Sequence, residues 1–333
     1  NIGHKNCKLS TYRFLEPIVS EPFSYPPFRP RDNEQNLPEP AAVQVLKSSL
    51  FKCPSCSSNL DQPTEGQVNT YQCANRHCFD IAKEGYVNLL LAQRRRSTKP
   101  GDSDEMIRSR QRFLNAGYYQ PLADAITQKV QQFGAHQRVL DIGCGEGYYL
   151  QQLRTSASDI QLYGIDISKT AVRLAAKRKL NAQLAVDSAF NIPLIDSSIN
   201  TAISVFSPIS AIETARVLTP KGRLIMVGPG AKHLAGLTAH IYENTVSHQG
   251  NPFNTTATDS EFNLLETLEL EQEITVRLSD IEDLLKMTPY YWHARPEQQQ
   301  TICALKELTT TVHFVINIYA PKEATDLSLI ADQ

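Results

Sequence analysis

Five cysteine and histidine side chains lie close together within residues 53–78. Two residues lie between Cys53 and Cys56 and sixteen between Cys56 and Cys73, which is followed by His77 and Cys78. Two such pairs on tight turns place four soft ligands in a tetrahedron, the geometry that Zn²⁺ takes in structural sites. The pattern alone does not choose between His77 and Cys78 as the fourth ligand. The alternative interpretation is a group of buried or redox-active thiols, for which this spacing is uncommon.

A glycine-rich turn follows a strand-like run at residues 138–142. It contains Gly143, Gly145 and Gly147. Glycine permits backbone angles that other residues avoid and lets a ligand approach the main chain. A dinucleotide-binding turn needs a small residue at the sixth position of G-x-G-x-x-G, but Tyr148 occupies it here. The pattern G-x-G-x-G is instead typical of the S-adenosylmethionine loop of Rossmann-like methyltransferases.

Acidic residues end the next two predicted strands. Asp166 lies 19 residues after Gly147, where a carboxylate can accept hydrogen bonds from both hydroxyls of a ribose. Asp187 follows the third strand, where methyltransferases often place a group that contacts adenine. An Asp at a strand end often only caps a helix. At these combined spacings, however, the residues predict a cofactor site.

Strand and helix patterns alternate from residue 138 onward, which predicts an α/β fold with a doubly wound, Rossmann-like sheet. The expected strands are 138–142, 161–166, 182–186, 201–206 and 224–228, with 272–278 and 311–319 as a final pair that we interpret as antiparallel. The expected helices are one capped by Asp102 or Ser103, then 121–133, 147–153, 170–179, 209–218, 232–247 and 279–288. We divide the chain into a disordered or extended segment (1–45), a zinc-binding domain (46–93), a basic linker and helix (94–118), a methyltransferase domain (119–320) and a tail (321–333).

Composition restricts the classes of function. The chain has 333 residues, of which 41% are hydrophobic and 20% charged, and its net charge is −2. It can bury a core, and any RNA contact must come from a local patch. It has neither an apolar run long enough to span a membrane nor a signal peptide, so we expect a cytoplasmic protein. The chain begins with Asn and its first methionine is Met106, which suggests the hypothesis that residues 1–45 lie upstream of the natural start.

The residues from about 51 to 319 resemble the bacterial 23S rRNA (guanine-N1-)-methyltransferases. The resemblance is carried by the Cys-Pro-Ser-Cys run at 53–56 and by segments 77–90, 100–103, 113–122, 140–149, 228–234 and 287–296. Segment 79–90, joined to the Cys/His cluster, is the most specific of these, whereas 140–149 would fit many methyltransferases. The resemblance implies methyl transfer from S-adenosylmethionine to N1 of a guanine in a hairpin of domain II of 23S rRNA.

The resemblance also implies site residues. It favours His77 over Cys78, which gives a structural Zn²⁺ held by Cys53, Cys56, Cys73 and His77. It adds Tyr119 and His233 to the cofactor site, although a buried aromatic and a surface histidine are the ordinary interpretations of such residues. The expected cofactor-binding set is Tyr119, Asp141, Gly143, Gly145, Glu146, Gly147, Asp166, Asp187 and His233.

A basic stretch is the expected RNA contact. Between 94 and 112 seven basic residues meet three acidic ones, a local charge of +4, and such residues contact phosphates. The expected contacts are Arg94, Arg95, Arg96, Lys99, Arg108 and Arg112, with Arg110 in the same stretch. The alternative is a solvated helix with salt bridges. Tyr290, Tyr291 and Trp292 form either a stacking platform for the target base or part of the core.

The catalytic group is left open. Guanine N1 carries a proton at pH 7 that must leave near the transition state. The candidates are Asp187, whose position suits adenine better, and Ser207 and Pro208, which follow the fourth strand. Two rival functions share parts of the pattern. One is a small-molecule methyltransferase of the quinone type, and the other is a non-enzymatic zinc-ribbon RNA-binding protein. A homodimer is a further option for the assembly.

Overall fold

The computed structural model describes residues 49–63, 69–94, 101–243 and 256–322. The expectations for residues 1–45, Arg95, Arg96, Lys99 and the tail fall outside these ranges. Within them, no helix is long and apolar enough to cross a membrane.

A small three-stranded sheet carries the Cys/His cluster. Its strands are β1 (Leu60–Asp61), β2 (Thr70–Cys73) and β3 (Cys78–Asp80), paired antiparallel in the order β1-β2-β3. The chain then forms β4 (Tyr86–Asn88), which leaves this sheet and pairs in parallel with a strand of the large sheet. The large sheet therefore begins inside the segment that the sequence analysis assigns to zinc binding.

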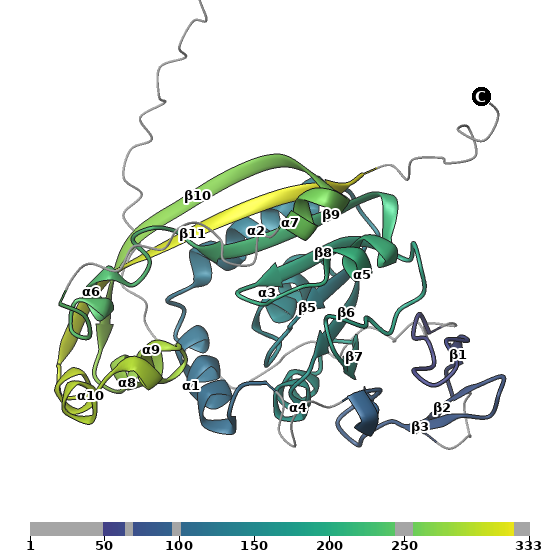
Figure 1. Ribbon diagram of the computed structural model, residues 1–333, viewed down its shortest axis with the longest axis horizontal. Helices are drawn as coiled ribbons and strands as arrows, with labels where there is room; N and C mark the ends of the chain where they lie inside the picture. The colour runs from purple at the N-terminus through teal and green to yellow at the C-terminus, as the bar shows by residue number, and fades with distance from the viewer. Residues whose placement is uncertain (1–48, 64–68, 95–100, 244–255, 323–333) are drawn as a thin grey trace, which may run out of the picture. The chain divides into compact units, whose positions relative to one another are not determined.

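The large sheet has eight strands in the order β10-β11-β9-β8-β5-β6-β7-β4 (Figure 1). Strands β4 to β9 run parallel, and β11 lies antiparallel between β9 and β10. Their bounds are β5 (Arg138–Ile142), β6 (Gln161–Asp166), β7 (Ala182–Val186), β8 (Ile199–Val205), β9 (Leu218–Pro229), β10 (Phe262–Arg277) and β11 (Glu307–Pro321). This is the doubly wound sheet that the alternating pattern predicts, ended by the expected antiparallel pair.

Helices connect these strands. They are α1 (Asp104–Asn115), α2 (Gln120–Gln132), α3 (Tyr148–Ser156), α4 (Lys169–Lys177), α5 (Ala211–Val217), α6 (Ala235–Thr238), α7 (Thr256–Glu261), α8 (Ser279–Lys286), α9 (Tyr290–His293) and α10 (Pro296–Cys303), with a short 3₁₀ turn at Ala92–Arg94. Helix α1 begins after Ser103, whose hydroxyl accepts a hydrogen bond from the Met106 amide, as an N-cap does.

Two hydrophobic clusters cover the two faces of the sheet. Alternate residues of a strand point to opposite faces, so Val139 joins one cluster and Leu140 the other. The first cluster includes side chains of α2, α3 and α4. The second includes side chains of α5 and of the zinc-binding segment, among them Phe51 and Leu60. The zinc-binding module thus packs as part of the layer that covers the second face.

Three helices are inserted between β10 and β11. Helix α8 packs against α1 through a bidentate ion pair between Arg112 and the buried Asp283 and a second pair between Lys286 and Glu105. The Tyr118 hydroxyl also donates to Asp280 at 2.9 Å. In Figure 1 the insertion lies beside α1, at one end of the long β10–β11 hairpin.

The expected helix at 232–247 is wrong in extent. Only Ala235–Thr238 is helical, and residues 244–247 fall outside the described ranges. The segment packs directly on β11, where the Gly236 amide donates to the Thr310 hydroxyl at 3.0 Å. A Cβ on Gly236 would lie 2.1 Å from the Thr309 carbonyl oxygen. This contact with β11 replaces the longer helix.

Several strand bounds also differ from the expectation. Strand β8 ends at Val205, because Phe206 turns away with φ of 53°. Strand β9 begins at Leu218, six residues before the expected start. Strand β10 begins at Phe262, ten residues before the expected start. Its first half contains exposed residues such as Leu264, so the sequence there does not show the alternation of apolar and polar residues that predicts a half-buried strand.

Candidate metal centre and cofactor pocket

The metal cluster is formed by two turns of the small sheet. The Sγ atoms of Cys53, Cys56 and Cys73 and a ring nitrogen of His77 all lie within 4.8 Å of one another. Backbone hydrogen bonds close the turns, from Ser57 N to Cys53 O at 2.8 Å and from Cys73 N to His77 O at 3.1 Å. The four ligand atoms therefore point at one centre.

The spacing of these atoms fits Zn²⁺. Bonds of about 2.3 Å to sulfur and 2.0–2.1 Å to nitrogen in a tetrahedron separate two sulfurs by about 3.8 Å and sulfur from nitrogen by about 3.6 Å. The structure has 3.7 Å between the Cys56 and Cys73 sulfurs. The Nδ1 atom of His77 lies 3.5 Å from Cys53 Sγ and 3.4 Å from Cys73 Sγ. The residues present therefore form a site that a tetrahedral zinc ion fills.

The structure brings His77, rather than Cys78, into the cluster. Cys78 is exposed and its thiol faces Gln72 and the Arg76 carbonyl. Hydrogen bonds led by the one with Ser58 lower the pKa of Cys56 to about 5, which favours the thiolate that a metal requires.

The glycine-rich turn has the backbone that the sequence predicts. Gly143, Gly145 and Gly147 have φ of 75°, 54° and 85°. A Cβ on Gly143 would lie 2.0 Å from the Oγ atom of Ser207, so the turn contacts the segment after β8 with no space for a side chain. The Gly145 amide donates to Asp166 at 2.9 Å, which joins the ends of β5 and β6.

Three carboxylates surround this turn. Asp141 and Glu146 are 1% and 2% exposed, and the Oδ2 atom of Asp141 and Oε1 of Glu146 have no hydrogen-bond partner in the described ranges. Burial, with Asp166 and Glu146 nearby, raises the pKa of Asp141 to about 8. Burial likewise raises the pKa of Asp166. Buried acceptors without donors are costly unless a ligand satisfies them, so this group of carboxylates suits a cationic ligand with N–H donors.

Arg178 holds one of these carboxylates. Its guanidinium forms a buried ion pair with Glu146 and donates to the Glu146 carbonyl at 2.8 Å. It also donates to Asn115 on α1 at 3.0 Å. Arg178 thereby connects the end of α4 to the glycine-rich turn and to α1. No sequence motif pointed to this residue, because its partners lie 32 and 63 residues away.

An aromatic group borders the same edge of the sheet. Tyr119 is buried, lies edge-on to Phe314 with ring centroids 4.9 Å apart, and has its hydroxyl 3.3 Å from Nε2 of His233. The Nδ1 atom of His233 accepts the His313 amide at 3.2 Å, so the neutral ring carries its proton on Nε2 and donates to Tyr119. The Phe206 ring lies 5.4 Å from the His233 ring. The predicted Tyr119 and His233 therefore meet, together with two phenylalanines that the sequence did not single out.

The three catalytic candidates lie after β7 and β8. Asp187 is 1% exposed and its amide donates to the Asp166 carbonyl at 3.1 Å, which places it beside the predicted ribose-binding carboxylate. The Ser207 carbonyl accepts the Ser204 hydroxyl at 2.8 Å, and Pro208 is exposed.

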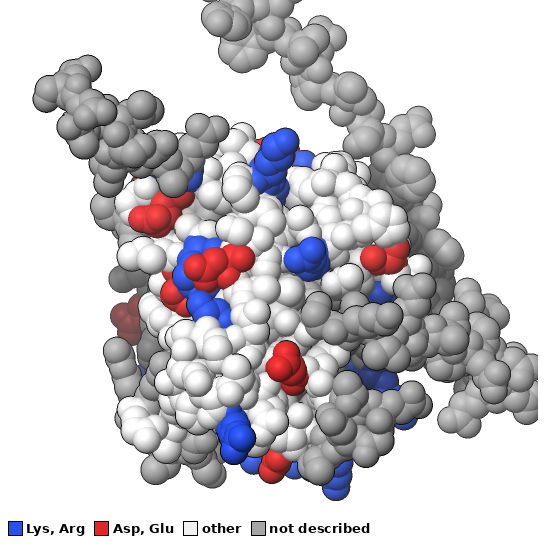
Figure 2. All heavy atoms as spheres, turned by 90° about the vertical axis from the view of Figure 1, so that its right-hand side faces the viewer, with Lys and Arg blue, Asp and Glu red and all other residues white. Residues whose placement is uncertain are grey.

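The basic residues of α1 behave differently from one another. Arg108 is exposed. Arg110 donates to Asp102 at 2.6 Å and to the Met287 carbonyl. Arg112 pairs with Asp283. The salt-bridged alternative therefore describes Arg110 and Arg112, while Arg108 stays available to a phosphate. Figure 2 shows one face of the molecule on which basic and acidic side chains are interspersed among uncharged ones.

The aromatic run on α9 divides in two. Tyr290 is 9% exposed and belongs to the core cluster. Trp292 is 69% exposed, and its ring lies edge-on to Tyr291 with centroids 5.1 Å apart. The core interpretation holds for Tyr290, and the stacking interpretation fits Trp292.

Comparison with known proteins agrees with both parts of the site. A family described as "RlmA, N-terminal" matches residues 51–98, and one described as "Methyltransferase domain" matches residues 134–274. The 23S rRNA (guanine(748)-N(1))-methyltransferase of Streptomyces fradiae is 32% identical over 284 residues, which cover 80% of this chain and 95% of that protein.

Two further relatives bear on the rival functions. A protein of Micromonospora griseorubida, named provisionally as a 23S rRNA (guanine-N(1)-)-methyltransferase, is 29% identical, with 81% of this chain and 97% of its own length covered. A demethylmenaquinone methyltransferase of Thermotoga maritima is 31% identical over 120 residues, which are 33% of this chain and 52% of that protein.

Proposed function

The chain belongs to the family of 23S rRNA (guanine-N1-)-methyltransferases, and we propose that it transfers a methyl group from S-adenosylmethionine to N1 of a guanine in a hairpin of domain II of 23S rRNA. The observation that carries the proposal is the joining of two sites in one fold. A four-ligand metal cluster lies in a module that packs on one face of the sheet, and buried carboxylates and a glycine-rich turn come together where β5 and β6 of the same sheet end. A small-molecule methyltransferase would need only the pocket.

The cofactor supplies an electrophilic methyl group on a sulfonium ion. We infer that Asp166 accepts the ribose hydroxyls, as the equivalent carboxylate does in related folds. The unpaired oxygens of Asp141 and Glu146 would then accept hydrogen bonds from the ammonium group of its amino-acid part. Gly143, Gly145 and Gly147 let the ligand lie against the backbone. Asp187 contacts the adenine, and Tyr119 with His233 closes the pocket on the side of β11.

The chain contributes to the reaction mainly by positioning. Holding the nucleophile in line with the methyl group and excluding water accounts for much of the rate of such a transfer. The hairpin base must leave its stack to reach the pocket. We propose that Ser207 and Pro208 border that base through their backbone, and that Trp292 stacks on an RNA base.

The RNA contacts complete the proposal. Arg94, Arg95, Arg96, Lys99 and Arg108 contact phosphates. Arg112 is paired with Asp283. The protein works in the cytoplasm, where ribosomes are made. A homodimer stays a prediction for the assembly.

Transfer of labelled methyl to unmodified 23S rRNA tests the proposal. We expect label in 1-methylguanosine after nucleoside digestion, and none in a quinone acceptor. Cofactor binding without transfer to RNA would discard the substrate and favour the small-molecule rival. Absence of cofactor binding by calorimetry would favour a non-enzymatic RNA-binding protein.

A further inference from the structure

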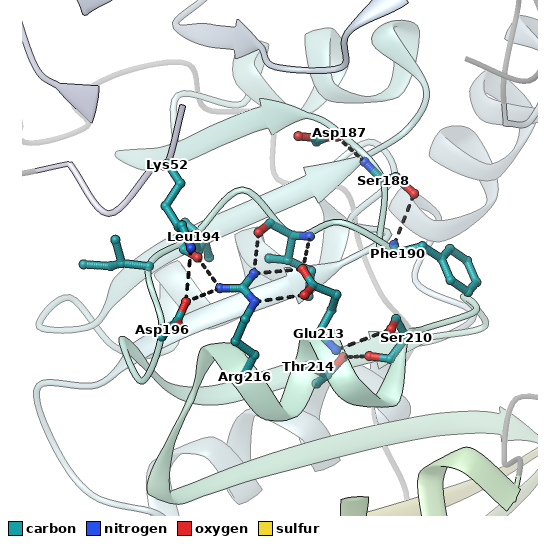
Figure 3. A network of polar contacts seen from close by, with 12 residues as sticks. Lys52, Asp187, Ser188, Phe190, Leu194, Asp196, Ser210, Glu213, Thr214 and Arg216 are labelled. Carbon is teal, nitrogen blue, oxygen red and sulfur yellow. Dashed lines mark hydrogen bonds and ion pairs between the residues drawn. The ribbon is translucent and has the colours of Figure 1, made fainter. Parts of the chain in front are cut away.

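Arg216 on α5 lies at the centre of a polar network between the zinc-binding module and the sheet (Figure 3). Its five N–H groups make five hydrogen bonds: to both Glu213 oxygens at 2.9 and 2.8 Å, to Asp196 at 2.6 Å, and to the Leu194 and Ile192 carbonyls at 2.8 and 2.7 Å. Glu213 in turn accepts the Ile192 amide at 2.8 Å. An arginine has five donors, so every one of them is used.

Residues 192–196, which include three of these partners of Arg216, also form hydrogen bonds with the zinc-binding module. The Lys52 amide donates to the Pro193 carbonyl at 3.0 Å, and the Ile195 amide donates to the Leu50 carbonyl at 2.9 Å. Lys52 Nζ also lies 3.3 Å from Asp196, as Figure 3 shows. Residues 192–196 therefore contact both the zinc-binding module and the guanidinium of Arg216. The contacts with the module are made by Leu50 and by Lys52, which directly precedes the ligand Cys53.

This segment continues directly from the cofactor pocket. Asp187 is followed by a turn that Ser188 closes, with its hydroxyl accepting the Phe190 amide at 3.1 Å and its carbonyl accepting the Asn191 amide at 3.0 Å. Only residues 188–191 separate Asp187 from the anchored Ile192, whose side chain is 2% exposed. A shift of the anchored segment is thus transmitted to Asp187 through one short turn.

We propose that Arg216 is a positioning residue for the cofactor site, which fixes residues 187–196 against α5 and the zinc-binding module and so couples that module to cofactor binding. The inference rests on the proposed contact of Asp187 with the cofactor. Without the guanidinium, the Leu194 carbonyl loses its Arg216 donor, while the Ile192 carbonyl keeps only the Leu194 amide and Glu213 keeps only the Ile192 amide among their bonds in the described ranges. Loss of hydrogen bonds to half-buried acceptors is costly. The segment would then loosen where it leads into the pocket.

The test compares Arg216→Met with Arg223→Met in the zinc-loaded protein. Arg223 is the matched control, because its hydrogen bonds in the described ranges go to the neighbouring carbonyls of Lys221 and Gly222, at 2.9 and 2.8 Å. We expect Arg216→Met to weaken S-adenosylmethionine binding about tenfold, a size typical of small displacements in a site. We also expect faster hydrogen–deuterium exchange in residues 187–196 with zinc content unchanged. Arg223→Met should match the wild type in all three measurements.

Kinetics separate positioning from general loss of stability. Arg216→Met should raise KM for S-adenosylmethionine more than it lowers kcat, with KM for RNA unchanged. Equal cofactor affinity in Arg216→Met and the wild type, or equal weakening in Arg223→Met, would overturn the inference. If Arg216→Met does not fold, Arg216→Lys should bind the cofactor about threefold more weakly, since an amine cannot reach all the acceptors, and wild-type affinity there would overturn it. Absence of RNA methylation by the wild type, with normal cofactor binding, would instead reject the proposed function.

Discussion

The metal cluster and the candidate cofactor site differ in whether their buried polar atoms have partners within the protein. In the cluster, four ligand atoms from two turns within a stretch of 25 residues converge on one centre. In the pocket, the ends of several strands bring together carboxylates whose oxygens on Asp141 and Glu146 have no donor in the described ranges. The first arrangement is closed by one ion and serves structure, whereas the second is completed only by a ligand that binds and leaves.

Loss of a metal ligand should have the largest effect. Cys73→Ser removes a thiolate that is 3% exposed and belongs to the hydrophobic cluster shared with the sheet. Zinc contributes about 10–16 kcal/mol to folding in small zinc domains, so we expect loss of zinc and an insoluble or inactive protein. Zinc content by atomic absorption and a thermal melt measure this. Cys78→Ser is the control, and zinc loss in that variant would show that the fourth ligand is assigned wrongly.

Adding a side chain to the glycine-rich turn should weaken cofactor binding without affecting the metal cluster. Gly143→Ala places a Cβ 2.0 Å from Ser207 Oγ, which forces the turn or the segment after β8 to move. We expect cofactor affinity to fall about 100-fold while zinc content stays normal. Gly134→Ala is the matched control, because its φ of 119° is also positive but nothing lies within 4 Å of the added atom. Equal loss in both variants would mean that backbone strain, rather than the contact with Ser207, is responsible.

Cofactor binding should release a proton from Asp141. Its pKa of about 8 lies above the value of about 3.9 for an unfolded aspartate, so the free protein keeps this proton at pH 7. A bound cation favours the ionised form, and affinity should therefore rise with pH up to about 8. The same shift makes the ligand-free protein less stable as pH rises through this window, because the folded state binds more protons.

Calorimetry in buffers of different ionisation enthalpy measures the released proton. We expect close to one proton at pH 7 for the wild type and none for Asp141→Asn, whose affinity should be about tenfold lower. A wild-type value near zero would show that Asp141 is already ionised before the cofactor binds.

The exposed tryptophan should affect RNA binding only. Stacking on one base contributes about 1–3 kcal/mol, so Trp292→Ala should raise KM for RNA about fivefold or more and leave cofactor affinity unchanged. Ile212→Ala on α5, a residue 66% exposed, is the control for loss of exposed apolar surface. Unchanged KM for RNA in Trp292→Ala would remove the stacking role.

The sequence predicts the parts of the site that are local in the chain. The metal ligands and the three glycines lie in short motifs whose spacing sets their geometry. The structure brings the four ligand atoms together and gives all three glycines a positive φ. Arg178 and Arg216 were missed because their partners come from distant segments that only the fold brings together. The predicted helix at 232–247 was wrong because its apolar spacing does not reveal the close contact of Gly236 with β11.

Primer extension on methylated 23S rRNA tests the central claim most directly. A methyl group on N1 blocks the pairing edge of guanine, so reverse transcriptase should stop beside a single guanine in a hairpin of domain II after treatment with the wild type. The stop should be absent after treatment with Gly143→Ala. Incorporation of labelled methyl without any stop would place the methyl group on another atom and contradict the assigned reaction.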